Sequence, residues 1–496
     1  MNKRVVLTGE QMSHQDRYTI DDLGVPGAWL MECAASAVRL SFQSFLKNTD
    51  QIAVVCGSGN NGGDGYAVAR QLHIQGYNVS CFQSDQVKSQ DAKMNRDIAL
   101  KSGVPVKSIG CFSPDKFTWV VDALVGTGLN RPLKNDLIEV VKLVNEVKNI
   151  VSIDIPSGIC SVTGQGWGCF IEASTTITFQ YAKRGHYLKD GIRATGKLVI
   201  ADIGIAPLDS DEQCWYRLLP SDPVAPCRLQ DSSSHKGIQG RVTVVGSALG
   251  MVGAGLFCAK AAQNVGSGLV SIMAPEQSMI ALQSQCPEIM VKPFGSPVIA
   301  DALILGPGCS QQIQIKDELK NVLRSFKGKV VIDAEGLRIF EDWEELISII
   351  GLNRICSDVL LTPHPGEMNA LLKLYKEYGG GDLSDMLKEL NEVGVAVLAK
   401  DAYSVLFFPE HQPVILGEPN ANLARGGSGD VLAGIIGSFM AKGHTIYEAC
   451  ILAMNWFSSA ASATNLILTD ASFRASSPMH LILKSLSTLR LRLTNN

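Results

Sequence analysis

Residues 52–82 read IAVVCGSGNNGGDGYAVARQLHIQGYNVSCF, and this stretch decides the fold class. Its pattern predicts a strand at Ile52–Cys56, a glycine loop at Gly57–Gly65, a helix at Tyr66–Gln75 and a second strand at Asn78–Phe82. A strand, a helix and a strand in this order form a βαβ unit, in which the two strands lie parallel. The sequence therefore predicts an α/β fold.

The chain is too long for one ordinary domain. With 496 residues and 46% hydrophobic content it can bury large cores, and two or three domains are expected. Between Pro207 and Ser234 the periodicity gives way to prolines, serines and acidic residues, a composition typical of a linker. We therefore expect a first domain at residues 1–212, a linker at 213–234 and a second domain at 235–496.

A second α/β pattern follows the predicted linker. A strand is predicted at Arg241–Val245 and a helix at Ala254–Asn264. Further strands are predicted at Leu269–Met273, Ala302–Leu305, Val330–Ile332, Val359–Leu361 and Val395–Leu398. The two halves are similar in class, but they do not repeat each other at a fixed spacing.

Composition narrows the possible partners. The formal charge of -4 and the pI near 6.1 offer no basic face for nucleic acid, so a phosphate-bearing partner is expected to be a small molecule. The 13 cysteines include no CxxC pair, which indicates reduced thiols and a cytoplasmic protein. Residues 1–24 lack the apolar core of a signal peptide, and Lys260 interrupts the apolar stretch Met251–Ala262, so neither secretion nor a membrane span is expected.

Polar residues gather where strands of the first half end. The strand predicted at Trp119–Val121 ends at Asp122, and the strand predicted at Ile150–Ile153 ends at Asp154. Ligands of open parallel sheets bind at the carboxyl ends of the strands, so several polar side chains are expected to converge there: Asn60, Asn61, Asp64, Asp122 and Asp154. Asp154 can act as an acid or base at this edge, or it can accept hydrogen bonds within its own turn.

The glycine loop of the first half allows several interpretations. Gly57, Gly59 and Gly62 fit the GxGxxG pattern, and Asp85 lies where a ribose-binding acid is expected, so a dinucleotide-binding unit must be considered. Carboxylate, amide and hydroxyl oxygens suit a weakly bound cation, and three residues can supply them: Asn61, Asp122 and Ser157. The same residues also suit helix caps and turns.

The second half carries the run Gly426-Gly427-Ser428-Gly429-Asp430, followed by the apolar segment Val431–Met440. Glycines and a helix start turn backbone N–H groups toward one point, which suits a phosphate or an oxyanion. A carboxylate beside an anion site is repelled by it, unless it accepts a proton from a hydroxyl that attacks phosphorus. Asp430 therefore indicates phosphoryl transfer, with helix capping as the alternative.

Other polar residues of the second half follow predicted strands. His364 lies between two prolines after the strand Val359–Leu361, so ligand contact is favoured over burial in a core. Lys400 can supply a positive charge for a nucleotide phosphate, or it can be an exposed lysine after a strand. Gly306–Gly308 allows close backbone approach, and His235–Gly237 can close the site from the linker.

Together these motifs resemble those of the bifunctional NAD(P)H-hydrate repair enzymes, in which an NAD(P)HX epimerase is fused to a nucleotide-dependent NAD(P)HX dehydratase. The resemblance covers nearly the whole chain. In the first half it is carried by Leu30–Glu32, Gly57–Gly65, Asp122, Gly126–Pro132 and Asp154–Gly158. In the second half it is carried by His235–Gly237, Gly306–Gly308, Thr362–Glu367, Lys400 and Gly426–Gly434.

The resemblance implies two three-layer α/β domains, an N-terminal Rossmann-like doubly wound sheet and a C-terminal ribokinase-like domain. It implies that Asp154 and Asp430 are catalytic. It implies that the hydrate is bound by Asn60, Asn61, Gly62, Gly63, Asp64, Gly126, Thr127, Gly128, Leu129, Asn130, Arg131, Pro132, Ala254, Gly308 and His364. It implies that the adenine nucleotide is bound by Lys400, Asp401, Ala402, Tyr403, Ser404 and Gly429, and K⁺ by Asn61, Asp122 and Ser157.

The activity implied by the resemblance is repair of hydrated nicotinamide cofactors. The epimerase would exchange the R and S forms of NADHX and NADPHX. The dehydratase would convert the S form to NAD(P)H at the expense of ADP or ATP, through phosphorylation of the C6 hydroxyl and elimination. K⁺ and Mg²⁺ are the implied cofactors, and a cytoplasmic homo-oligomer with no nucleic-acid or membrane partner is expected.

Several positions depart from the family pattern. Cys33 replaces an asparagine, Glu335 replaces an aspartate, and Asp401 follows Lys400 where glycine is usual. Asp401 adds a negative charge near the expected phosphate site, which Arg425 can partly offset. Three other functions stay open at this point: a ribokinase-like kinase for a small alcohol, an NAD(P)-dependent oxidoreductase, and a non-catalytic nucleotide-sensing scaffold.

Overall fold

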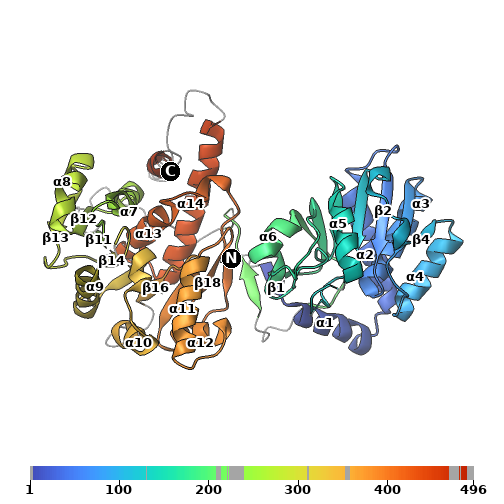
Figure 1. Ribbon diagram of the computed structural model, residues 1–496, viewed down its shortest axis with the longest axis horizontal. Coiled ribbons are helices and arrows are strands. Elements are labelled where there is room, and N and C mark those ends of the chain that lie inside the picture. Colours follow the sequence, from blue (N-terminus) through green and yellow to red (C-terminus); the bar gives the residue numbers. More distant parts are fainter. Residues whose placement is uncertain are drawn as a thin grey trace. The chain divides into compact units, whose positions relative to one another are not determined.

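Figure 1 shows the computed structural model of the chain, which describes residues 4–129, 131–133, 135–207, 214–220, 222, 239–309, 312–351, 358–468, 480 and 482–488. The chain forms two compact units, Arg4–Trp215 and Tyr216–Asn496. Both are α/β units, as the sequence predicts. No helix in the described part of the chain is long and apolar enough to cross a bilayer.

The N-terminal unit is built on a parallel sheet with the strand order β4-β3-β2-β5-β6-β7-β9. Its strands are β1 (Arg4–Leu7), β2 (Gln51–Cys56), β3 (Asn78–Gln83), β4 (Val106–Ser108), β5 (Trp119–Ala123), β6 (Ile150–Ile153), β7 (Thr175–Phe179), β8 (Ala182–Lys183) and β9 (Lys197–Ala201). The short strands β1 and β8 pair with each other in parallel. Because the strand order reverses between β2 and β5, a crevice is expected at the carboxyl ends of these two strands.

Helices flank this sheet. One of them, α3, begins earlier in the sequence than predicted. The α-helices are α1 (Gly9–Arg17), α2 (Gly27–Gln43), α3 (Asn60–Ile74), α4 (Gln90–Lys101), α5 (Asn135–Asn145) and α6 (Lys189–Thr195), with a π-helical turn η1 (Tyr18–Asp22) and 3₁₀ turns η2 (Ile109–Cys111), η3 (Pro114–Lys116) and η4 (Arg184–Tyr187). The prediction of a loop up to Gly65 was wrong, since α3 already begins at Asn60.

The glycines of this segment serve packing within α3 rather than a loop. A Cβ atom at Gly62 would lie 2.1 Å from the carbonyl oxygen of Gly57, and a Cβ atom at Gly65 would lie 2.6 Å from the Cβ of Ala123. Such contacts are far too close for any side chain, so only glycine lets α3 approach β2 and β5 so closely. This close approach places Asn60 and Asn61 in the first turn of α3, at the carboxyl edge of the sheet.

The C-terminal unit is built on a sheet with the strand order β13-β12-β11-β14-β15-β16-β17-β18-β19-β10. Its strands are β10 (Trp215–Arg217), β11 (Arg241–Val245), β12 (Leu269–Ala274), β13 (Met290–Pro293), β14 (Ala302–Leu305), β15 (Lys329–Ile332), β16 (Val359–Leu361), β17 (Val395–Ala399), β18 (Ser404–Phe407) and β19 (Val414–Leu416). The sheet is parallel from β13 to β17, and β18 is antiparallel to both of its neighbours.

Two hydrophobic cores cover opposite faces of this sheet. The α-helices are α7 (Val252–Val265), α8 (Glu276–Gln285), α9 (Ile313–Ser325), α10 (Trp343–Gly351), α11 (Pro365–Glu377), α12 (Leu383–Glu392), α13 (Ser428–Ala441) and α14 (Ile446–Leu468), with 3₁₀ turns η5 (Ala334–Arg338) and η6 (Ala421–Leu423). Ala302 and Ile304 of β14 belong to the core with α7, α13 and α14, whereas Leu303 and Leu305 belong to the core with α9 to α12. Alternate residues of a strand face opposite sides, so the unit has three layers.

The unit boundary lies close to the predicted end of the first domain. The structure divides the chain after Trp215, within strand β10, and the prediction ended the first domain at residue 212. Most of the predicted linker, with His235, Lys236 and Gly237 after it, lies outside the described residues. The linker at 213–234 therefore stays a prediction.

Candidate active sites

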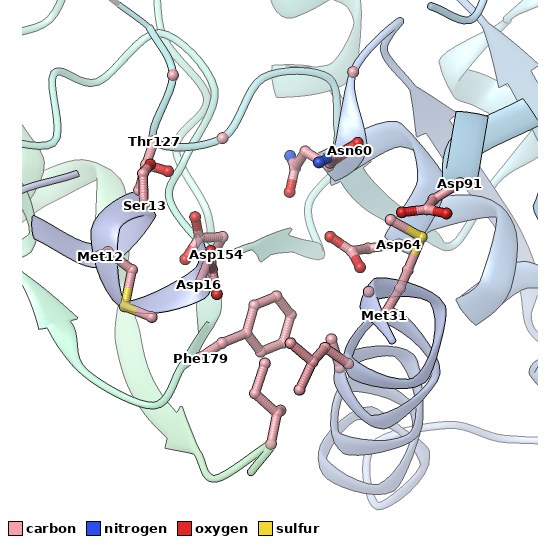
Figure 2. Close-up of a pocket in the computed structure, with 18 of the residues that line it drawn as sticks. Met12, Ser13, Asp16, Met31, Asn60, Asp64, Asp91, Thr127, Asp154 and Phe179 are labelled. Carbon is pink, nitrogen blue, oxygen red and sulfur yellow. The ribbon is translucent and has the colours of Figure 1, made fainter. Parts of the chain in front are cut away.

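A cavity of about 630 Å³ opens at the carboxyl edge of the N-terminal sheet. Figure 2 shows it between the first turn of α3, the loop after β5 and the turn after β6. Seven of the residues singled out from the sequence line this one cavity: Asn60, Asn61, Asp64, Gly126, Thr127, Gly128 and Asp154. The structure therefore brings together groups that lie far apart in the sequence, at the point where the strand order reverses.

Asp154 is held in an unusual backbone conformation beside this cavity. Its φ of +68° is uncommon for a residue other than glycine. Its N–H donates to the carbonyl of Ile177 at 2.8 Å, and its carbonyl lies 3.0 Å from Nε2 of His186. The backbone N–H of Lys183 donates to Nδ1 of His186 at 3.0 Å, so the neutral ring carries its proton on Nε2 and donates it to Asp154. These bonds fix the turn that presents the carboxylate.

Lys183 keeps the carboxylate of Asp154 ionised. Its ammonium group is 1% exposed and lies 2.6 Å from Oδ1 of Asp154, which also accepts a hydrogen bond from Thr178 at 3.0 Å. Burial alone would raise the pKa of Asp154, but the charge and hydrogen bond of Lys183 hold that pKa below its ordinary value. Asp154 is thus a half-buried carboxylate that can act as a proton acceptor.

Two of the further carboxyl groups that line the cavity, Asp16 and Asp64, have pKa values that shift the other way. Burial raises the pKa of Asp16, on α1, to about 6, with Asp154 raising it further and Lys183 opposing the rise. Burial raises the pKa of Asp64, on α3, well above its ordinary value, and the nearby charges of Asp154 and Asp16 add to the rise. One cavity therefore combines a carboxyl group whose pKa is lowered, one whose pKa is raised to about 6 and one whose pKa is raised well above its ordinary value.

The other described residues of this unit that are implied to bind the hydrate lie outside the cavity lining. Gly62 and Gly63 are buried inside α3, where they allow close packing. Leu129 packs against the hydrophobic cluster that includes α5, and Arg131 and Pro132 are exposed. Asn130 lies outside the described residues.

The residues predicted to hold a cation lie at the carboxyl edge of the N-terminal sheet. They are Asn61, Asp122 and Ser157. Both carboxylate oxygens of the buried Asp122 accept hydrogen bonds, from Ser157 Oγ at 2.6 Å, Ser152 Oγ at 2.8 Å and the backbone N–H groups of Ser157 and Leu124 at 2.9 and 3.2 Å. Burial still raises the pKa of Asp122 against these bonds. The amide nitrogen of Asn61 is buried without a hydrogen-bond partner, beside Gly126.

This donor set fits a weakly bound monovalent cation. Amide and hydroxyl oxygens of Asn61 and Ser157 suit a hard cation, and Asp122 supplies negative charge behind them. Amide O and N positions are interchangeable by a flip, so the unpartnered end of Asn61 can present its oxygen. A cation there would also offset the cost of burying the ionised Asp122.

In the C-terminal unit, Asp430 lies in the first turn of α13. The helix is preceded by Gly427, whose φ of +92° requires a glycine, and no side chain caps its first turn. Helix capping by Asp430 is therefore not seen. Burial raises the pKa of Asp430 to about 6, with Asp333 and Glu367 adding to the rise and Lys400 opposing it. Close packing positions the helix, because a Cβ atom at Gly434 would lie 2.1 Å from the carbonyl oxygen of Cys258 in α7.

Three neighbouring strands of this sheet, β15, β16 and β17, are each followed by a polar residue at the carboxyl edge. Asp333 follows β15, Thr362 follows β16 and Lys400 follows β17. The Oδ1 atom of the buried Asp333 lies 2.5 Å from Lys400 Nζ and accepts a hydrogen bond from Thr362 Oγ1 at 2.8 Å. A Cβ atom at Gly429 would lie 3.2 Å from Lys400 Nζ, so the glycine loop reaches the lysine. The structure thus gathers Lys400, Gly429 and Asp430 at the carboxyl edge of the sheet.

The remaining predicted residues of this unit are placed around that edge. His364 is half exposed and caps α11, since its Nδ1 accepts from the N–H of Gly366 at 3.0 Å. Gly308, with a φ of +67°, faces Ala254 at the start of α7, where an added Cβ would lie 3.1 Å from the Cβ of Ala254.

Asp401 and Ala402 are exposed, Ser404 is buried at the start of β18, and Tyr403 is half-buried. The guanidinium of Arg217 lies 5.0 Å from the ring centroid of Tyr403. The carboxylate of Asp401 accepts a hydrogen bond from the N–H of Ala402 at 2.8 Å. The carboxylate of Asp401 is therefore bonded within its own turn at the surface.

Sequence reasoning missed four polar residues of these sites. They are Asp16, Lys183, His186 and Asp333. Asp333 ends the predicted strand Val330–Ile332 and follows the same rule as Asp122 and Asp154, so the sequence offered a signal for it. Lys183 and His186 lie around a two-residue strand and Asp16 lies on an amphipathic helix, where nothing local distinguishes them from ordinary surface charges.

Comparison with known proteins places both units in characterised families. A family model described as NAD(P)H-hydrate dehydratase matches residues 242–484, and a model described as YjeF-related protein N-terminus matches residues 27–185. The bifunctional NAD(P)H-hydrate repair enzyme Nnr of Moorella thermoacetica is 32% identical over 481 residues, covering 88% of each chain. The enzyme of the same name from Escherichia coli K12 is 30% identical over 456 residues, covering 90% of this chain and 86% of the relative.

Solved structures resemble part of the chain. A ribokinase-like superfamily protein from Enterococcus faecalis is 26% identical, covers 54% of this chain and 92% of its own, and has a TM-score of 0.44. An ADP/ATP-dependent NAD(P)H-hydrate dehydratase from Bacillus subtilis, co-crystallised with ATP and Mg²⁺, is 22% identical, covers 53% of this chain and 93% of its own, and has a TM-score of 0.41.

Proposed function

The chain belongs to the family of bifunctional NAD(P)H-hydrate repair enzymes, and we propose that each of its two units performs one of the two reactions. The N-terminal unit exchanges the R and S forms of NADHX and NADPHX at C6. The C-terminal unit dehydrates the S form to NADH or NADPH at the expense of ADP or ATP. The observation that carries this proposal is that each unit has its own half-buried aspartate with a shifted pKa, Asp154 or Asp430, at the carboxyl edge of its sheet.

In the epimerase, Asp154 accepts the proton of the C6 hydroxyl. The C6 hydroxyl and the ring nitrogen N1 form a hemiaminal, which opens to an aldehyde when the hydroxyl loses its proton and the C6–N1 bond breaks. Rotation of the aldehyde and reclosure produce the opposite configuration at C6. Lys183 supports this role because it keeps Asp154 ionised and ready to accept the proton. Asn60, Thr127 and Gly128 line the cavity and bind the hydrate.

In the dehydratase, Asp430 accepts the proton of the C6 hydroxyl as that oxygen attacks the terminal phosphorus of the nucleotide. Hydroxide is a poor leaving group, whereas the phosphate ester leaves readily when electrons of the ring nitrogen expel it. The backbone N–H groups at the start of α13 stabilise the negative charge of the transferring group, since they have no partner within the helix. Lys400 and Gly429, which lie together, contact the nucleotide.

Two ions complete the proposal. K⁺ would be held by Asn61 and Ser157 with Asp122 behind them, and it would fix the loops that bind the hydrate. Mg²⁺ would enter with the nucleotide and neutralise phosphate charge, since this ion is usually bound through substrate phosphates and waters with few protein ligands. We also propose a cytoplasmic location and a homo-oligomer.

The proposal is tested by adding the purified chain to NADHX with ADP or with ATP. Recovery of the reduced-nicotinamide absorbance is expected with at least one nucleotide, and epimer exchange is expected without any. A folded protein that recovers no NADH with either nucleotide would contradict the dehydratase assignment. A kinase for a small alcohol would give the C-terminal unit a role, but it leaves the cavity of the N-terminal unit without one.

A further inference from the structure

Opening a hemiaminal needs two proton transfers, and Asp154 accounts for one of them. The hydroxyl oxygen loses a proton, while the departing nitrogen N1 must gain one. On reclosure both transfers run backwards. A second acid–base group on the cavity wall is therefore required, or water must replace it.

Asp16 is placed on the same cavity wall as Asp154. Both line the cavity, and Figure 2 shows them on one side of it, with Asp64 reaching in from the opposite side. Lys183, which contacts Asp154, lines the same cavity. Asp16 is half-buried, so it borders the space that a ligand would fill.

The helix that carries Asp16 is fixed at both ends. Thr8 forms a capping box with Gln11 at its start. A Cβ atom at Gly9 would lie 2.5 Å from Ser161 Oγ and 3.0 Å from the carbonyl oxygen of Thr127, so the helix start is pressed against the loop after β5. Beyond its end, Thr19 donates to the carbonyl of Gln15 at 2.8 Å and accepts from the N–H of Ala206 at 3.0 Å. A side chain on such a helix is held in place, as a catalytic group requires.

We propose that Asp16 is the second acid–base residue of the epimerase, and this inference rests on the epimerase activity proposed above. In the opening step the Asp154 carboxylate takes the hydroxyl proton, the C6–N1 bond breaks with its electron pair moving to N1, and protonated Asp16 gives its proton to N1. After rotation about the C5–C6 bond, N1 attacks the aldehyde carbon. Asp16 takes the N1 proton back and Asp154 returns its proton to oxygen, so nothing is consumed.

The charges around Asp16 suit this exchange. Lys183 on β8 and Arg17 on its own helix are positive, whereas Asp154 after β6, Asp64 on α3 and Asp91 on α4 are carboxyl groups lining the same cavity. Burial together with Asp154 raises the pKa of Asp16 to about 6, so the group can both give and take a proton near neutral pH.

Asp64 is the rival for this role. Burial first, and then Asp154 and Asp16, raise its pKa well above its ordinary value, so it holds its proton more tightly than a free carboxyl group does. It also lies across the cavity from Asp154, whereas Asp16 lies on the same side as Asp154. The position of Asp16 on the side of the proton acceptor therefore favours it for the second transfer.

The test measures epimer exchange of NADHX in the full chain without nucleotide, so that the dehydratase is idle. We expect Asp16→Asn to slow exchange by about 100-fold or more, the usual cost of losing a general acid–base group. Asp16→Glu should restore part of the rate. Asp22→Asn removes an exposed carboxylate from the adjacent π-helical turn and is the matched control, with exchange expected at the wild-type rate.

The pH profile separates a proton-transfer role from a structural one. Opening needs protonated Asp16 with ionised Asp154, so wild-type kcat/KM should fall as pH rises through about 6. This limb should be missing in Asp16→Asn. If Asp16→Asn exchanged epimers at the wild-type rate and its kcat/KM still fell above pH 6, the proposed role of Asp16 would be overturned. No exchange by the wild-type chain above the enzyme-free rate would instead overturn the epimerase function.

Discussion

Asp154 and Asp430 are both half-buried aspartates at the carboxyl edge of a parallel sheet, yet their neighbours give them different acidities. Lys183 contacts Asp154 directly and holds its pKa below the ordinary value. Lys400 pairs instead with Asp333, and burial leaves the pKa of Asp430 at about 6. The comparison shows that the pKa of such an aspartate depends on whether the nearby lysine forms its ion pair with that aspartate or with another carboxylate. One fold class thus supports two different proton acceptors in one chain.

The largest expected effect comes from removing the lysine that Asp154 uses. In Lys183→Met the largest influence that opposes burial is lost and only His186 and Thr178 still oppose it, so the pKa of Asp154 should rise and a larger fraction of the carboxyl group should be protonated. We expect epimer exchange to fall by about 100-fold or more at pH 7 while dehydration persists.

The control for this variant is Lys197→Met, which removes an exposed lysine from the same unit. Thermal unfolding of both variants shows whether the N-terminal unit stays folded without the buried ion pair. If a folded Lys183→Met protein exchanged epimers at the wild-type rate with an unchanged pH profile, the claim that Lys183 sets the acidity of Asp154 would be contradicted.

The two reactions should respond to pH in opposite directions. Asp430 must be ionised to accept a proton, so dehydration should fall as pH drops through about 6, by about tenfold for each unit below the pKa. Epimer exchange should fall as pH rises through about 6, because Asp16 then loses its proton. Measuring kcat/KM for both reactions on one preparation sharpens the comparison. Dehydration that increases on acidification would show that Asp430 is not the base.

The smallest expected effect concerns Asp401. Its carboxylate is exposed and bonded to its own turn, and exposed charges contribute less than about 1 kcal/mol. Asp401→Gly should therefore change the KM for ADP or ATP by less than about fivefold, with kcat unaltered. A larger decrease in KM would mean that this charge repels the nucleotide phosphates. The C-terminal site would then differ from the N-terminal site in weakened nucleotide binding as well as in the acidity of its aspartate.

Sequence reasoning predicted the sheets well because buried strands are short apolar runs. The strands at Ile150–Ile153, Arg241–Val245, Ala302–Leu305 and Val359–Leu361 have the predicted bounds. The start of α3 was misplaced because glycines that allow close packing look, in one sequence, like glycines that form a loop. Asp122 was placed at the end of a strand but lies within β5.

The candidate sites were predictable only in part. Residues that follow long apolar strands, such as Asp154 and Lys400, are marked by their position. Lys183 and Asp16 are not marked, because their importance arises from burial against a carboxylate that is distant in sequence. The acidity of each group depends on such three-dimensional neighbours, which no local pattern reveals.

The central claim is that the two aspartates serve separate reactions. It is tested most directly by measuring both activities, epimer exchange and nucleotide-dependent recovery of NADH from the S form, in full-length Asp154→Asn and Asp430→Asn. The account predicts that Asp154→Asn loses exchange and keeps dehydration, and that Asp430→Asn loses dehydration and keeps exchange. Equal loss of both activities in both folded variants would contradict it.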